Sequence, residues 1–215
     1  MKKLFVLLAF LAGPMAIATA ASAQTPSAQR FASCLIQAHP EKVRELLRAT
    51  SVQAANRPYH FLADDDRCLA SVFGNQSFRP DETAVSVAML RGRLAEQELL
   101  RQSQQVAALQ ALPLQKAYSR PWFAATERHP EVDEMATCIA DTDPAGIMAI
   151  IRTTPGFAGE GAAFAALSPS LTKCLAAGTR LDASPEALRA ALADALYQRL
   201  NNPALSTAPT GGTVH

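Results

Sequence analysis

Two matching stretches of sequence decide the fold: ASCLIQAHPEKVRELLRAT at residues 32–50 and ATCIADTDPAGIMAIIRTT at residues 136–154. Each has a cysteine, a proline six residues later, and then aliphatic residues spaced three and four apart. The second stretch follows the first by 104 positions, and similar residues surround a further cysteine in each half, Cys68 and Cys174. This repetition predicts two similar units, each with one pair of cysteines.

The composition of both units favours helices, because Ala, Leu, Arg, Glu and Gln dominate and β-branched runs are rare. In the first unit the pattern predicts helices over 28–38, from Pro40, over 59–73 and from Pro80 through Leu100, with a loop over 51–57. In the second unit it predicts a helix around Cys138, another from Asp143-Pro144, a third element broken near Ser168-Pro169, and a last helix from Ser184-Pro185-Glu186. We therefore expect an all-α fold with two similar disulfide-stapled lobes of about four helices each, related by internal duplication.

The first residues form a pattern typical of an export signal. Lys2 and Lys3 precede an apolar run that ends near Thr19, and residues 21–23 are a small-residue cleavage site. We expect cleavage after Ala23 and a periplasmic or secreted mature chain without a transmembrane segment. The alternative is a retained membrane anchor, for which the apolar run is short.

The remaining boundaries follow from the repeat and from the composition between its copies. The expected organisation is a signal peptide at 1–23, a first lobe at 24–103, a connector at 104–129, a second lobe at 130–201 and a tail at 202–215. The tail is rich in Pro, Gly and Thr, a composition typical of disorder.

The charge balance argues against a nucleic-acid binder. The chain has 20 Lys+Arg and 19 Asp+Glu, and removal of Lys2 and Lys3 with the signal leaves 18 basic residues. Binding to nucleic acid depends on a basic surface that displaces counterions, and a nearly neutral chain has no such excess.

Four cysteines in an exported chain indicate two disulfides, and they can be joined in three ways. The repeat favours Cys34–Cys68 and Cys138–Cys174, because an ancestral unit that folded alone had only its own two cysteines to join. No C-x-x-C motif is present, so neither a thioredoxin-like couple nor a zinc knuckle is indicated.

No cluster of residues predicts catalysis, a cofactor or a metal. His60 and Asp64 lie four residues apart on an expected helix and could hold a metal, but a solvated acidic face is the preferred interpretation. The arginine pairs Arg48/Arg152 and Arg93/Arg199 recur in both units. We interpret the first pair as cations near helix C-termini and the second as structural, the alternative being an anion site used twice.

The connector contains the single tryptophan, Trp122, together with Tyr118 and Phe123. Such aromatic residues anchor protein partners, so these three are a candidate partner contact. The alternative is that they pack against the lobes on either side.

The chain resembles exported bacterial helical proteins of unknown function that carry duplicated two-cysteine units. The resemblance is carried by Cys34, Pro40, Cys68-Leu69 and LRGRLAE at 90–96, while the second unit departs from it with LYQRL at 196–200. It covers both units but neither the connector nor the tail. It implies an exported bacterial protein and assigns no catalytic residue.

The residues that the two units share are structural: cysteines, prolines and regularly spaced aliphatic residues. No cluster of polar residues is shared. We therefore expect a non-enzymatic, exported helical protein that acts by binding, with a protein as the candidate partner, or by structural support. Two alternatives remain open: a periplasmic chaperone or stress protein, and an enzyme whose site lies between the lobes.

Overall fold

A computed structural model describes residues 25–73, 85–175, 179 and 181–206. The expected signal peptide, Gly74, Pro80 and most of the expected tail lie outside these residues. Within them every regular element is a helix, which confirms the all-α class. None of the helices in the described ranges has the length and apolar character that crossing a bilayer demands.

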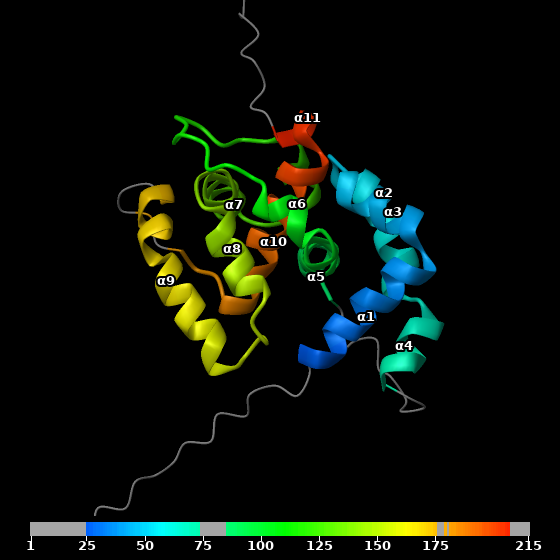
Figure 1. The fold of residues 1–215 in the computed structure, drawn as a ribbon. Helices are drawn as coiled ribbons and strands as arrows, with labels where there is room; N and C mark the ends of the chain where they lie inside the picture. Colours follow the sequence, from blue (N-terminus) through cyan, green and yellow to red (C-terminus); the bar gives the residue numbers. More distant parts are fainter. Residues whose placement is uncertain (1–24, 74–84, 176–178, 180, 207–215) are drawn as a thin grey trace, which may run out of the picture.

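Figure 1 shows the helices in chain order. They are α1 (Thr25–Ala38), α2 (Pro40–Arg48), α3 (Val52–Ala63), α4 (Asp66–Phe73), α5 (Val87–Arg101), α6 (Ser103–Ala107), the 3-10 helix η2 (Pro121–Ala125), α7 (Pro130–Thr142), α8 (Pro144–Ile151), α9 (Ala158–Cys174), α10 (Pro185–Asn201) and α11 (Pro203–Ser206). Proline at the first position starts α2, α8 and α10, where its missing N–H costs nothing. Side-chain oxygens of Ser51, Ser86, Asp143 and Ser184 cap helices by accepting a backbone N–H three residues ahead.

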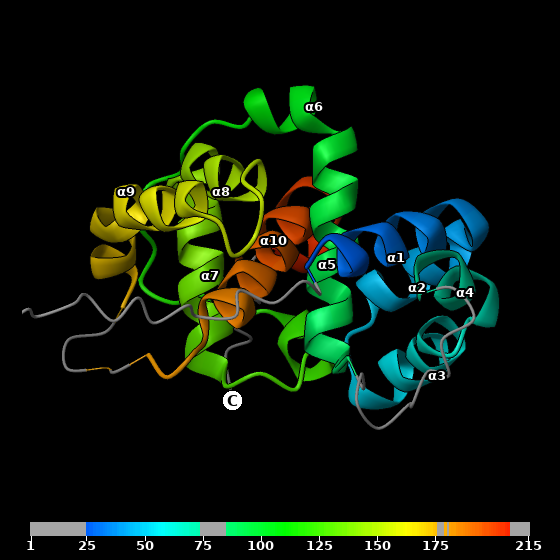
Figure 2. The ribbon, with the colours of Figure 1, turned by 90° about the horizontal axis from the view of Figure 1, so that it is seen from below.

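Helices α5 and α10 cross at the centre of the molecule. Helices α1 to α4 lie on one side of them and α7 to α9 on the other (Figures 1 and 2). The crossing is close because Gly92 of α5 faces Ala190 of α10: a Cβ atom on Gly92 would lie 2.4 Å from the Ala190 Cβ. Residues from both halves form one continuous hydrophobic core around this crossing.

Two disulfides are present, and they have the pairing that the repeat favours. Cys34 of α1 is bonded to Cys68 of α4, and Cys138 of α7 is bonded to Cys174 of α9. Each bridge therefore ties the first helix of its half to the helix that packs against it. No cysteine in the chain is left free.

The first half differs from its prediction between residues 51 and 73. The expected loop at 51–57 is the first part of α3, since Ser51 caps Ala54 and Ala55 is buried. The single helix expected over 59–73 is instead two helices, α3 and α4, separated at Asp64 and Asp65. The helix expected from Pro80 begins at Val87, behind the Ser86 cap.

The second half differs in the opposite sense, because α9 runs without a break through Pro169. The proline cannot donate a hydrogen bond to the carbonyl of Ala165, and Ala165 is exposed to solvent. Beyond α10 the chain continues as α11, so the beginning of the expected disordered tail is helical.

The connector is tied to the helices along its length. Leu112 N–H donates to the carbonyl of Asp141, and the guanidinium of Arg199 donates to the carbonyl of Gln110. Near its end Arg128 donates to the carbonyl of Ala88 in α5. These bonds fix the connector against α5, α7 and α10.

Candidate functional site

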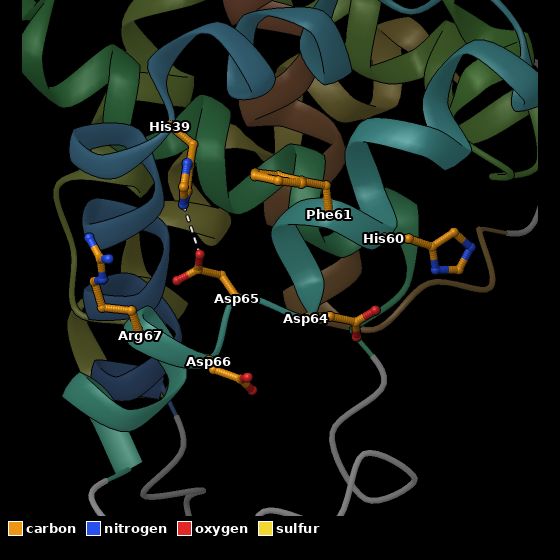
Figure 3. A pocket seen from close by; sticks show the side chains of 7 residues that line it. All are labelled: His39, His60, Phe61, Asp64, Asp65, Asp66 and Arg67. Carbon is orange, nitrogen blue, oxygen red and sulfur yellow. Dashed lines mark hydrogen bonds and ion pairs between the residues drawn. The ribbon is translucent and has the colours of Figure 1, made fainter.

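The break between α3 and α4 creates a pocket of about 640 Å³ on the surface of the first half. Figure 3 shows the residues that line it: His39, His60, Phe61, Asp64, Asp65, Asp66 and Arg67. His39 comes from the junction between α1 and α2, and the other six come from the end of α3 and the start of α4. The pocket thus unites residues that are distant in sequence.

Asp65 holds the pocket together. One carboxylate oxygen lies 2.8 Å from His39 Nε2, and the other accepts the backbone N–H of Cys68 at 2.7 Å, which caps α4. Burial alone would raise the pKa of Asp65, but the bonds from Cys68 and His39 and the charge of Arg67 outweigh burial and lower the pKa. Asp65 is therefore an ionised structural anchor rather than a proton donor near neutral pH.

Phe61 is the apolar part of the pocket. Its side chain is 49 % exposed, an unusual state for a large apolar group. The edge-to-face contact with His39, with ring centroids 5.0 Å apart and an interplanar angle of 86°, holds the phenyl ring in place. The Phe61 ring is therefore exposed to solvent, while its contact with His39 fixes its orientation.

Asp64 and Asp66 flank the anchor. Both are exposed, and neither forms an ion pair with any residue in the described ranges. The Arg67 side chain extends away from Asp66, and the His60 ring points away from the His39–Asp65 pair (Figure 3). The pocket therefore includes two carboxylates without an ion pair in the described ranges, and both point away from the Phe61 ring (Figure 3).

Metal binding is the alternative that the sequence left open for His60 and Asp64. The part of the chain that the structure describes contains no group of three or more His, Cys, Asp or Glu residues arranged to hold a metal ion. His60 and Asp64, the pair considered from the sequence, both line the pocket but gather no third ligand.

A His–Asp pair also occurs in hydrolytic sites, where the histidine activates a nucleophile. No serine, threonine or cysteine is among the residues that line this pocket. The His39–Asp65 pair therefore lacks the group on which such a pair acts, and its contacts are those of a clamp between α2 and α4.

The corresponding place in the second half is closed. There Asp143, which precedes Pro144 as His39 precedes Pro40, accepts a hydrogen bond from Ser170 Oγ at 2.8 Å. This bond joins the α7–α8 junction to α9 as His39–Asp65 joins the α1–α2 junction to α4. There α9 is unbroken, and Leu167 of α9 packs against Gly146 of α8.

A second hollow of about 520 Å³ lies between α1 and α5. Its lining residues are Gln29, Arg30, Ser33, Cys34, Gln37, Gln97 and Leu100. Its polar groups are used internally, because Gln29 donates to Glu96 and Ser33 donates to Gln97. It offers fewer free groups than the pocket around Phe61.

The sequence-based interpretation missed the buried ion pairs at the crossing of α5 and α10. Arg91 of α5 bonds Asp194 of α10, with Nε 3.0 Å from Oδ2, and Arg189 of α10 bonds Glu96 of α5, with Nη2 2.7 Å from Oε1. All four side chains are buried. A signal existed: RGRLAE at 91–96 and RAALAD at 189–194 share the pattern R-x-x-L-A-acid, 98 positions apart.

Arg91 and Arg189 also bond the C-terminal carbonyls of α2 and α8. The sequence had suggested Arg48 and Arg152 for this role. Arg91 donates to the carbonyls of Leu46 and Leu47 at the end of α2, and Arg189 donates to those of Ile150 and Ile151 at the end of α8. Arg48 does lie in the last turn of α2, and Arg152 is the C-cap residue of α8, as the sequence predicted, but it is Arg91 and Arg189 that bond the carbonyls there. Arg48 instead donates to Asn202, and Arg152 is exposed.

The second arginine pair has structural contacts in both halves. Arg93 forms ion pairs with Glu96 and Glu186, and Arg199 donates to the carbonyls of Ala140 and Asp141. The two arginines do not occupy corresponding places, because the R-x-x-L-A-acid pattern aligns α5 with α10 at an offset of 98 and not 106.

The connector aromatics lie mostly inside the molecule. Trp122 is 1 % exposed and packs edge-to-face on Phe123, with ring centroids 4.7 Å apart. Tyr118 is also buried, and its hydroxyl accepts the N–H of Gln115. These positions match the packing interpretation; only Phe123, half-buried, is within reach of a partner in this conformation.

The fold and pocket define an all-helical protein with two internal disulfides and one aromatic, acidic surface pocket. No family model, no curated protein and no solved structure matches this chain. Its function is therefore argued from the geometry of the pocket.

Proposed function

We propose that this chain is an exported, non-enzymatic protein that binds a protein partner through the pocket around Phe61. The observation that carries the proposal is the exposed phenyl ring of Phe61, held against His39 in a surface pocket that Asp64 and Asp66 also line. Exposed aromatic residues with a polar rim are typical of contact sites between proteins. Export is supported by the two disulfides, which persist in oxidising compartments.

A binding role is favoured over an enzyme whose site lies between the halves. The contact between α5 and α10 is filled by Arg91, Arg189, Glu96 and Asp194, which are all buried and bonded to one another across the crossing. No space for a substrate is left among these side chains. The open pocket, in turn, has no Ser, Thr or Cys side chain for the His39–Asp65 pair to activate.

The proposal includes an origin of the two halves by internal duplication. In support, Arg91 pairs with Asp194 while Arg189, 98 positions after Arg91, pairs with Glu96, 98 positions before Asp194. Gly92 and Ala190, which meet at the crossing, are separated by the same 98 positions. Such reciprocal contacts are those of a two-fold dimer interface, here within one chain. On this view the pocket is a feature that only the first half acquired.

Site-directed photo-crosslinking tests the binding role. A photoreactive phenylalanine analogue replaces Phe61 in cells that export the protein, and a matched analogue replaces Phe157, which is 65 % exposed in the second half. We expect a discrete crosslinked adduct from position 61 only, which is reduced when Asp64→Asn and Asp66→Asn are added. Equal adducts from both positions, or none from position 61, would contradict the proposal.

The enzyme alternative has its own test. Purified protein is assayed for esterase, peptidase, amidase and glycosidase activity alongside His39→Gln. Turnover by the wild type that is lost in His39→Gln would replace the binding role with a catalytic one.

A further inference from the structure

We propose that the connector carries a proteolytic processing site at Lys116. A protease that cuts after lysine opens the folded chain there, and the two resulting polypeptides stay bound to each other. The proposal is independent of the pocket around Phe61. It is carried by the exposure of the connector, the placement of the disulfides and the contact between α5 and α10.

The middle of the connector is accessible to a protease. Residues 110–117 are all exposed and belong to no helix, and they form the longest unbroken run of exposed residues in the ranges that the structure describes. From 113 to 117 the backbone is held by a single hydrogen bond, from the N–H of Gln115 to the hydroxyl of Tyr118 at 2.7 Å. Folded proteins are cut at such exposed segments, because a protease must draw several residues of extended backbone into its active site.

Lys116 determines the class of protease. It is the one charged residue between 110 and 117, its side chain is exposed, and it forms no ion pair within the described ranges. Trypsin-like proteases hold such a basic side chain in a pocket that contains a carboxylate. Water then adds across the peptide bond between Lys116 and Ala117, which leaves a carboxylate on Lys116 and a new amino group on Ala117.

Tyr118 controls how readily this peptide bond is reached. The Tyr118 ring is buried, and its hydroxyl accepts the N–H of Gln115, so this hydrogen bond must break before the residues on both sides of Lys116 can extend. Releasing one hydrogen bond and one side chain is a local opening that leaves the core intact. The rate of cutting is therefore set by the fraction of molecules in which this segment is open.

No covalent link crosses the cut. Both cysteines of the first disulfide precede Lys116, and both cysteines of the second follow it. The two polypeptides are joined instead by the buried ion pairs between α5 and α10 and by the hydrophobic core that both halves share. A contact of this kind resembles the interface of an obligate dimer, in which the subunits stay together as long as they are folded.

The other lysines provide internal controls. Three lysines follow the expected signal peptide: Lys42, Lys116 and Lys173. Lys42 lies within α2, where the next residue, Val43, is buried, and Lys173 lies in the last turn of α9 beside the disulfide-bonded Cys174. Helical backbone enters a protease active site only after the helix has opened, so these two sites should be protected.

The test is limited proteolysis of the purified protein with a lysine-specific endoprotease, followed over time by mass spectrometry. Under native conditions we expect the cut after Lys116 to be at least about tenfold faster than the cuts after Lys42 and Lys173, whereas in urea all three should proceed at similar rates. Lys116→Gln should lose the native cut. Tyr118→Phe should be cut about fivefold faster than the wild type, because it lacks the hydroxyl that holds Gln115.

The state of the cut protein tests whether the two polypeptides stay bound. The cut protein should elute from a sizing column as one species of the intact mass, yet give two bands on a denaturing gel without reducing agent. Its midpoint of urea unfolding should rise with protein concentration, because two chains must now associate. The midpoint of Lys116→Gln treated with the same protease should not depend on concentration.

Cutting after Lys42 or Lys173 as fast as after Lys116 would overturn the processing site. So would a native protein that resists the protease at Lys116 while the urea-unfolded protein is cut there. Separation of the fragments on the sizing column would overturn their association, and an unchanged rate in Tyr118→Phe would remove the role assigned to its hydroxyl. None of these outcomes bears on the crosslink from position 61, so the two proposals fail separately.

Discussion

At the scale of single residues, buried arginines make the polar connections of this protein. The guanidinium of Arg189 is completely buried and bonds Glu96, Glu160 and the carbonyls at the end of α8. Burial alone would lower the pKa of Arg189, but its bonds to Glu96 and Glu160 outweigh burial and raise it. The charge is therefore retained, and its partners depend on it.

We expect Arg189→Met to lower the free energy of unfolding by about 3–5 kcal/mol. Glu96 and Glu160 would both lose this buried partner, and Glu96 would keep only its longer ion pair with Arg93. Urea unfolding followed by circular dichroism measures the change. Arg152→Met is the matched control, since Arg152 is exposed and forms no ion pair within the described ranges; its effect should stay within about 0.5 kcal/mol. Equal effects of the two substitutions would refute the role assigned to Arg189.

Asp194 should make stability depend on pH. Burial alone would raise the pKa of this completely buried carboxylate, but Arg91 and Arg128 outweigh it and the pKa is lowered. A lowered folded-state pKa means that ionised Asp194 stabilises the fold above its unfolded pKa of about 3.9, and that this contribution is lost as the pH falls through the folded pKa. We expect Asp194→Asn to cost about 3–5 kcal/mol at neutral pH, with the difference from wild type narrowing in acid.

Asp133 belongs to the same network of ion pairs, but its pKa is shifted in the opposite direction. Its pKa is raised, chiefly by burial, despite the bonds from Arg128 and Thr126. Protonated Asp133 therefore favours the fold, and the wild type should gain stability relative to Asp133→Asn as the pH falls through the folded pKa. The test is to measure the free energy of unfolding of the wild type, Asp194→Asn and Asp133→Asn across a pH series. If the differences of the two variants from the wild type changed with pH in the same direction, this account would be contradicted.

At the scale of elements, the helix break decides where the pocket is. Helices α3 and α4 are separated at Asp64 and Asp65, whereas α9 continues through Pro169 in the second half. The sequence suggested the reverse, because proline is the stronger local breaker. Tertiary bonds override it: His39 holds Asp65 at the cap of α4, while Asp143 holds Ser170 within α9.

The crossing of α5 and α10 should be sensitive to one methyl group. A Cβ on Gly92 would lie 2.5 Å from the Cα and 2.6 Å from the carbonyl oxygen of Ala190, so the backbones would have to separate. We expect Gly92→Ala to reduce the free energy of unfolding by about 1–3 kcal/mol despite the better helix propensity of alanine.

Gly161→Ala is the control for this prediction, because a Cβ at Gly161 of α9 meets no atom within 4 Å. It should stabilise the protein by about 0.5–1 kcal/mol through propensity alone. Thermal and urea unfolding of the two variants should therefore move in opposite directions. Stabilisation by both substitutions would show that the helices can separate without cost.

At the scale of the whole molecule, the two halves share one core. Buried residues of α1 to α5 and of α7 to α10 are continuous around the central crossing, and the connector is bonded to both sides. Stability is therefore expected to be a property of the whole chain. Damage to one half should be felt in the other.

Removal of either disulfide tests this cooperativity. In the double variants Cys34→Ala/Cys68→Ala and Cys138→Ala/Cys174→Ala, the opened loops span separations of 34 and 36 residues. Each should lower the free energy of unfolding by about 4 kcal/mol on the chain-entropy account. Scanning calorimetry should show one transition in each variant, shifted as a whole; two separate transitions would indicate independently stable halves.

Local patterns in the sequence were enough for the helical class, for the starts of α2, α8 and α10, and for the choice of cysteines that pair. Proline and capping residues act within a few positions of the helix end that they define, and the repeat supplied the pairing by comparison of its copies. The amphipathic spacing of Val43, Leu46 and Leu47 likewise predicted a face that is buried.

The ion pairs and the pocket were decided only by the tertiary structure. Arg91 meets Asp194 across 103 positions, and His39 meets Asp65 across 26, distances over which no periodicity links one residue to another. Of the many charged residues in the chain, only those that are buried are costly to remove. Which of them are buried depends on the tertiary structure. The local sequence therefore determines that the chain forms helices. The packing of α5 against α10 and the break between α3 and α4 determine which side chains come into contact.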